Sequence, residues 1–398
     1  MNRKVLAALL TLCLLSPAIS GCWDRQEPEQ LALVLAVGFD LDEKSGNYKI
    51  IAQIANPLGL GGEGPEAGGG GTGEAVWVVA ASGETPYLAS QNLTIKSTRQ
   101  INYTHTAVIL FSEDLARQGL EPLVDFLDRE RQFRLVAHPM VVEGDIRKAL
   151  EADFALEDVG AVGVVRHHFH TSQQKSVTRD VILRNIFNTF TQPGWEAAFP
   201  RLHLITDEEG EMIDEAPVEV KGLAAFKGGT MVGWLDDKET RGLNWALGEI
   251  NRADYMLQSP LEGGKPSTVE VFQAASRMRA QVKGDQVTVT LEIQADGRLQ
   301  ETLTNREWLG RESEFTRSLD RRLAQAIRND VRAALDKAQQ ELNSDIFGFG
   351  NLLYRTQPRE WSRLSARWDD IFPKIQVNIM VDANVRRTGL IKDPMIIR

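Results

Sequence analysis

The sequence contains very little cysteine: among its 398 residues there are only two, Cys13 and Cys22. Two cysteines cannot supply a four-thiolate metal site or the disulfide framework typical of small exported domains. A chain of this length is expected to form two or three domains. Those domains must therefore be stabilised by the packing of their own cores.

Basic runs and long apolar runs are also missing. The chain has 45 Lys and Arg against 55 Asp and Glu, a net charge of -10, which excludes a nucleic-acid binder that depends on phosphate contacts. After residue 22, no stretch reaches the roughly 18 consecutive apolar residues of a membrane-spanning helix. The hydrophobic fraction of 42% and charged fraction of 25% are those of a globular protein.

Catalytic motifs are absent. The sequence has no GxSxG, HExxH or CxxC motif. Residues Gly59 to Gly64 match GxGxxG, but Pro65 and further glycines follow where a helix would have to receive the pyrophosphate. We therefore predict that the protein is not an enzyme and binds no cofactor.

Three of the six histidines form one cluster, His167, His168 and His170. On a strand, His168 and His170 would face the same side and could hold a metal ion together. No third ligand follows at a fixed spacing, however, so we interpret the cluster as packed or solvated and predict no metal site.

The N-terminus has the pattern of an export signal. Arg3 and Lys4 precede the apolar run Val5 to Leu15, and Ile19-Ser20-Gly21-Cys22 follows. This end resembles a bacterial lipobox, which implies removal of residues 1–21 and acylation of Cys22. The mature chain would then keep one cysteine and no internal disulfide, and two or more acyl chains would anchor it durably.

Hydrophobic periodicity predicts both strands and helices, which do not alternate regularly along the chain. This favours an α+β fold, which we expect to consist of three mixed-sheet domains. The N-terminal region covers 22–206 and contains a glycine-rich segment, 57–74, that we expect to be a mobile loop. A strand-strand-helix segment occupies 218–265, and a C-terminal α+β domain occupies 266–398.

Four further predictions concern particular elements. Val177 to Phe190 has the apolar spacing of a helix, and Phe315 to Leu342 carries one apolar stripe typical of a long amphipathic helix. Alternation predicts three antiparallel strands, Thr268 to Ala275, Met278 to Val282 and Gln286 to Gln294. Five aromatic residues, Phe347, Phe349, Trp361, Trp368 and Phe372, are expected to be buried rather than to form an exposed partner surface.

The mature start and several later segments resemble the Ger(x)C family, the lipoprotein C subunits of spore nutrient-germinant receptors. The similar segments are Cys22–Glu27, Leu31–Asp40, Gly222–Lys227, Met231–Leu235, Glu239–Gly242, Asp345–Gly350 and Val385–Leu390. They occur in the family's order along nearly the whole mature chain. Pro28, where an aliphatic residue is usual, and the glycine-rich segment depart from the family pattern.

This resemblance implies a non-catalytic, multi-domain α+β lipoprotein on the outer face of the inner spore membrane. Its partners would be the membrane-embedded A and B subunits of a receptor for small nutrients, together with the lipid around acylated Cys22. The family has no assigned nutrient site in this subunit. Arg386 and Arg387 at the end of the last predicted strand are either solvated or face an acidic partner or lipid headgroups.

An alternative is the solute-binding lipoprotein of a transporter, which shares the anchor and the length. That class has two α/β lobes with regular strand-helix alternation around a ligand cleft, and the sequence lacks this alternation. A large shift of the melting temperature on adding an amino acid or a sugar would favour it.

Overall fold

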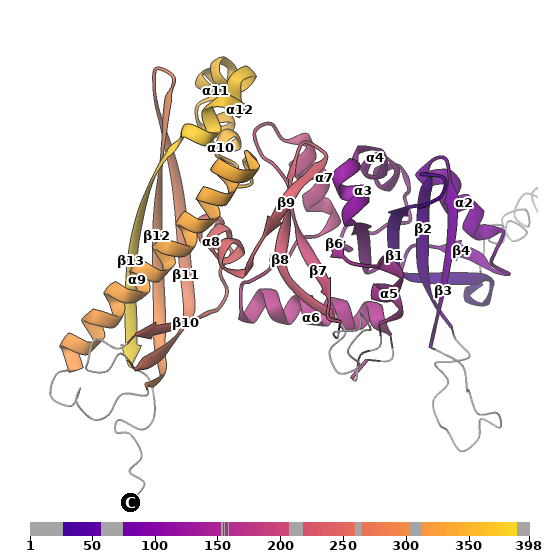
Figure 1. Ribbon diagram of the computed structural model, residues 1–398, viewed down its shortest axis with the longest axis horizontal. Coiled ribbons are helices and arrows are strands. Elements are labelled where there is room, and N and C mark those ends of the chain that lie inside the picture. Colours follow the sequence, from indigo (N-terminus) through magenta and orange to yellow (C-terminus); the bar gives the residue numbers. More distant parts are fainter. Residues whose placement is uncertain are drawn as a thin grey trace, which may run out of the picture.

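The computed structural model describes residues 27–56, 75–206 except 153, 155 and 158, 218–258, 265–302 and 312–387. Two β-sheets organise these residues, one of nine strands and one of four, and they stand side by side (Figure 1). The mixture of sheets and helices confirms the predicted α+β class. Cys22 and the glycine-rich segment 57–74 lie outside the described residues.

The nine-stranded sheet has a parallel centre with antiparallel margins. Its strand order is β3-β2-β1-β5-β6-β7-β8-β9, and β4 pairs with β1. Strands β1, β5, β6 and β7 run parallel, whereas β2, β3, β8 and β9 pair antiparallel. The strands are β1 (Leu31–Leu41), β2 (Tyr48–Ala55), β3 (Val76–Gly83), β4 (Gln100–Asn102), β5 (Val108–Ser112), β6 (His138–Glu143), β7 (Ala198–Leu204), β8 (Val218–Lys227) and β9 (Thr230–Leu235).

Helices cover both faces of this sheet. Along β5, Ile109 and Phe111 enter one core, whereas Val108 and Leu110 enter the core on the opposite face. The first face is covered by α2 (Pro86–Thr94), α3 (Glu113–Gln118), α4 (Glu121–Arg129) and α7 (Leu183–Thr191), and the second by α5 (Ile146–Glu151) and α6 (Gly160–Gln174). Burial on both faces explains why these strands are apolar at nearly every position.

The segment 218–258 belongs to both sheets. Strand β8 pairs antiparallel with β7, for example Leu202 with Val220, so β8 and β9 extend the sheet of the preceding region. Helix α8 (Asp237–Leu247) then leads to β10 (Ala253–Gln258), the first strand of the second sheet. One hydrophobic core accordingly contains Leu223 and Leu235 of the first sheet together with Val269 of the second.

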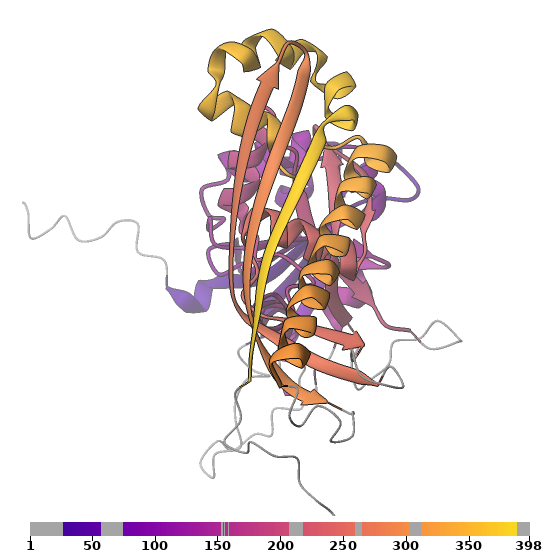
Figure 2. The ribbon, with the colours of Figure 1, turned by 90° about the vertical axis from the view of Figure 1, so that its left-hand side faces the viewer.

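The second sheet is built on one long hairpin (Figure 2). Its order is β10-β11-β12-β13, with β11 (Pro266–Lys283), β12 (Gln286–Thr302) and β13 (Gln376–Arg387). The expected division into three strands was wrong, because 268–275 and 278–282 form the single strand β11. A register shift between Val271 and Gln273 interrupts its alternation as a bulge does.

The long amphipathic helix is confirmed. Helix α9 (Glu312–Asp336) continues as a π-helical turn, η4 (Lys337–Leu342), and its stripe from Phe315 to Ala338 is buried. Gly242 of α8 lets the two helices approach closely, since a Cβ there would lie 2.0 Å from the carbonyl oxygen of Asp330. The remaining helical elements are η1 (Pro28–Gln30), α10 (Phe349–Thr356), α11 (Pro358–Leu364), η5 (Ser365–Arg367), α12 (Trp368–Ile371) and η6 (Phe372–Lys374).

A buried polar network joins α8, α9 and β10. Trp245 Nε1 donates to the Tyr255 hydroxyl at 2.8 Å, and that hydroxyl donates to Asp330 Oδ2 at 2.7 Å. Arg241 Nε also donates to Asp330 Oδ2 at 2.8 Å, and its guanidinium lies 4.7 Å from the centroid of the Tyr255 ring. Burial raises the pKa of Tyr255, so the phenol keeps its proton and remains a donor.

Replacing Tyr255 with Phe should lower the free energy of unfolding by about 2 kcal/mol, because Trp245 Nε1 loses its acceptor in a buried site. Urea unfolding measures the change. The matched control is Tyr354→Phe, since Tyr354 is 45% exposed. Equal losses in the two variants would contradict the importance of the network.

The predicted burial of Phe347, Phe349, Trp361, Trp368 and Phe372 is also confirmed, and Asp345 lies among them. Its carboxylate accepts hydrogen bonds from the backbone N–H groups of Phe349 at 3.0 Å and Gly350 at 2.8 Å, and from Trp368 Nε1 at 3.0 Å. The backbone carbonyl oxygen of Asp345 accepts a hydrogen bond of 3.0 Å from the backbone N–H of Glu196. Asp345 thus links the C-terminal helices to the segment before β7.

Burial raises the pKa of Asp345 to about 7 from the ordinary value of 3.8, although its three donors act in the opposite direction. The folded state therefore binds the proton more tightly than the unfolded state. The resulting stabilisation is complete below about pH 4 and is lost as the pH rises through 7.

Consequently, the stability of the wild type relative to Asp345→Asn should fall by a few kcal/mol, roughly, between pH 4 and 7 and stay constant above that range. Chemical denaturation of both proteins across this range measures the difference. A difference that rises with pH would refute the assignment.

Candidate functional site

The structure places the predicted histidine cluster on a helix. His167, His168 and His170 belong to α6, where residues two apart face different directions. His168 is fully buried, whereas His170 is exposed. The expectation that His168 and His170 share one side, as they would on a strand, was therefore wrong.

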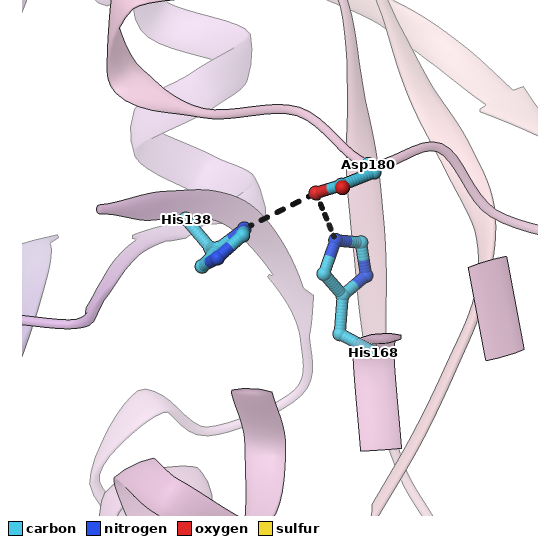
Figure 3. A group of neighbouring side chains, drawn as sticks. All are labelled: His138, His168 and Asp180. Carbon is cyan, nitrogen blue, oxygen red and sulfur yellow. Dashed lines mark ion pairs between the residues drawn. The ribbon is translucent and has the colours of Figure 1, made fainter. Parts of the chain in front are cut away.

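His168 instead meets two residues from other parts of the chain (Figure 3). His138 is the first residue of β6, and Asp180 lies in the segment between α6 and α7. The distance from Asp180 Oδ1 is 3.6 Å to His138 Nδ1 and 3.8 Å to His168 Nε2. The three possible ligand atoms lie within 4.8 Å of one another. We call these three residues the His-His-Asp group.

Burial of His168 follows from helical periodicity. Ala161, Val164 and His168 are spaced three and four residues apart and turn toward the same core. A helical interpretation of the sequence would have predicted this burial. The contribution of His138 and Asp180 could not be predicted, because neither lies at a recognisable spacing from His168.

The imidazole of His168 is neutral. Burial is the main cause, followed by repulsion from His138 and His167, and together they lower its pKa from 6.5 to about 3. Among the described residues, neither ring nitrogen of His168 has a hydrogen-bond partner, and neither does Nδ1 of His138. A neutral ring with an unpaired nitrogen next to a carboxylate is chemically suited to bind a metal ion.

The segment that carries Asp180 is held by the elements around α8. Arg179 forms two hydrogen bonds of 2.8 Å with the carboxylate of Glu249. Asn244 Nδ2 donates to the carbonyl oxygens of Ser176 at 2.8 Å and Thr178 at 3.0 Å. These contacts fix the position of Asp180 relative to α8.

The same contacts explain why the predicted helix Val177 to Phe190 was wrong in its first part. The carbonyl oxygen of Val177 accepts a hydrogen bond of 2.8 Å from the N–H of Gly222, which belongs to β8. In a helix, this oxygen would accept from an N–H four residues later in the chain. Helix α7 begins only at Leu183, whose N–H donates to the carbonyl oxygen of Ala137. Tertiary contacts thus override the local helical pattern.

The other predicted site residues have separate positions. Cys22 lies outside the described residues. Arg386 is exposed and donates to Asp296 Oδ1 on the neighbouring strand β12 at 3.2 Å. Among the described residues, the helices include none with both the length and the apolar character needed to span a membrane.

Two family models match the chain in succession. "Spore germination protein N-terminal domain" matches residues 24–204, and "Spore germination B3/ GerAC like, C-terminal" matches residues 221–389. Together they span both sheets. A protein with these two regions in this order is a spore germination protein of the GerAC-like class.

Individual proteins agree with this class. YfkR of Bacillus subtilis (strain 168) is 26% identical, with 96% of each chain covered. Spore germination protein KC of the same organism is 24% identical over 99% of this chain and 98% of its own. The crystal structure of the GerBC protein has a TM-score of 0.53 and 17% identity, covers 88% of this chain and 98% of that chain, and shows the shared fold. The chain belongs to the Ger(x)C family, as its sequence predicts.

Proposed function

We propose that this protein is the lipid-anchored, non-catalytic C subunit of a spore nutrient-germinant receptor. The observation that carries the proposal is the succession of both family regions, 24–204 and 221–389, over nearly the whole chain. Relatives of matching length are named as spore germination proteins. The subunit is needed for assembly and function of the receptor during germination.

The charged and polar groups of the interior support a structural role. Asp330, Tyr255 and Asp345 are buried and use their hydrogen bonds within the fold. A general acid or base must instead reach a substrate from a cleft. These groups stabilise a rigid body that can present surfaces to partners, which suits a receptor subunit.

Acylation of Cys22 would hold this body close to the membrane. Eight residues separate Cys22 from Leu31, the first residue of β1, so the link spans at most about 30 Å. Each buried methylene contributes about 0.8 kcal/mol, and two or more acyl chains give a durable anchor. Strand β1 lies within the nine-stranded sheet, so the anchor would keep that sheet next to the outer face of the inner spore membrane.

The partners in this proposal are the A and B subunits of the receptor, which are embedded in the same membrane. Confinement to one surface raises the effective concentration of the three subunits for one another. The anchor therefore favours assembly even where individual contacts are weak. No nucleic acid and no nutrient is assigned to this subunit.

Replacing Cys22 with Ala should abolish incorporation of a labelled fatty acid and reduce the share of the protein that sediments with membranes. The test requires cells without the A and B subunits, so that only the anchor can retain the protein. Cys13→Ala is the matched control, because Cys13 lies in the predicted signal and should leave labelling unchanged. Labelling that persists in Cys22→Ala would exclude acylation at this sulfur.

Deletion of the gene tests the receptor role directly. In a strain that keeps no other germinant receptor, spores lacking this protein should lose their response to nutrients, because the receptor does not assemble. The loss of optical density after nutrient addition measures the response. Restoration by the wild-type gene is the control, and an intact response without the protein would contradict the proposed function.

A further inference from the structure

The His-His-Asp group brings together side chains that the family assignment does not explain. A strand supplies His138, a helix supplies His168, and the segment before α7 supplies Asp180 (Figure 3). Within the described part of the chain, these residues form the one group of three or more His, Cys, Asp or Glu side chains close enough to hold a metal ion. We propose that His138, His168 and Asp180 bind one zinc ion.

The distances fit a zinc ion after small side-chain movements. Zinc binds histidine nitrogen at about 2.0–2.1 Å and carboxylate oxygen at about 2.0–2.2 Å, so tetrahedral ligand atoms lie about 3.4 Å apart. The observed separations between Asp180 Oδ1 and the two nitrogens are 3.6 and 3.8 Å. The third separation, between the two histidine nitrogens, is at most 4.8 Å, so side-chain movements of about 1 Å would bring all three atoms to bonding distance.

The burial of His168 supplies an independent argument. Its side chain is 1% exposed, and its Nε2 faces the carboxylate without a hydrogen bond. A buried polar atom without a partner destabilises a fold, and such atoms are usually satisfied. A zinc ion bound to Nε2 would satisfy this nitrogen.

The ligand set selects the kind of metal. Two imidazoles and one carboxylate suit zinc and neighbouring transition metals, whereas calcium and magnesium prefer oxygen ligands alone. Asp180 is 47% exposed and His138 is 21% exposed, so solvent reaches the group from one side. Three protein ligands then leave a fourth position for water or for a group from a partner.

The proposed ion would connect parts of the chain that are otherwise distant. His138 belongs to the nine-stranded sheet, and the segment with Asp180 is held by Arg179 on Glu249 and by Asn244 of α8. Helix α8 in turn packs against α9 beside the second sheet. Zinc binding would therefore stabilise the junction between the two sheets.

Zinc titration of the full chain in detergent tests the proposal. All proteins carry Cys13→Ser and Cys22→Ser, so that no thiolate competes for the metal. After removal of metal with a chelator, competition with a chromophoric chelator should show one zinc ion per chain, and zinc should raise the melting temperature. Cobalt in place of zinc should give the visible absorption bands of a four-coordinate site.

Variants assign the ligands. His168→Gln and Asp180→Asn should each weaken zinc binding by at least about 100-fold. Loss of a residue that only positions a metal ligand weakens binding by at most about that factor, so a larger effect identifies a ligand. Asp180 is half exposed, so its variant is expected to fold even if His168→Gln does not. The controls are His170→Gln, on the exposed side of the same helix, and His203→Gln, whose Nδ1 lies 2.6 Å from Glu143.

Unchanged binding and an unchanged zinc-induced rise in melting temperature in the two controls would support the site. The proposal is overturned if the wild type binds no zinc, if Asp180→Asn binds as tightly as the wild type, or if His203→Gln abolishes binding. None of these outcomes depends on the receptor role.

Discussion

The buried carboxylate of Asp330 is the interaction on which the rest of the structure depends. It accepts hydrogen bonds from Arg241 and Tyr255, and Tyr255 also accepts from Trp245, so one network fixes α8 against α9 and β10. A buried charge without these donors would be strongly destabilising. Because α8 is the link between the two sheets, its position sets how the N-terminal and C-terminal parts meet.

Contacts on the two sides of α8 position elements of both sheets. On one side, Asn244 and Glu249 hold the segment that carries Asp180 against the first sheet. On the other side, α9 packs along the long hairpin, and Asp345 connects the C-terminal helices to the backbone of Glu196. In the described part of the chain, a few buried polar contacts thus connect hydrophobic cores that belong to both sheets.

Local patterns predicted much of this fold, whereas long-range pairing did not follow from them. The stripe from Phe315 onward and the apolar strand β1 were predictable because burial imposes helical or alternating spacing. Strand β11 continues through Ser276 and Arg277, which pair with Ile293 and Glu292, so the predicted break there does not exist. The bond from Gly222 to Val177 replaced a predicted helical turn. His168 was a candidate, but His138 and Asp180 reach it only through the tertiary fold. Acylation of Cys22 stays a prediction.

The most direct measurement of the central claim is native mass spectrometry of the protein isolated with mild detergent from inner spore membranes. The account predicts a complex that contains the A and B subunits and this chain, beginning at residue 22 with the added mass of acyl groups. An unmodified chain that appears alone, without membrane partners, would contradict it.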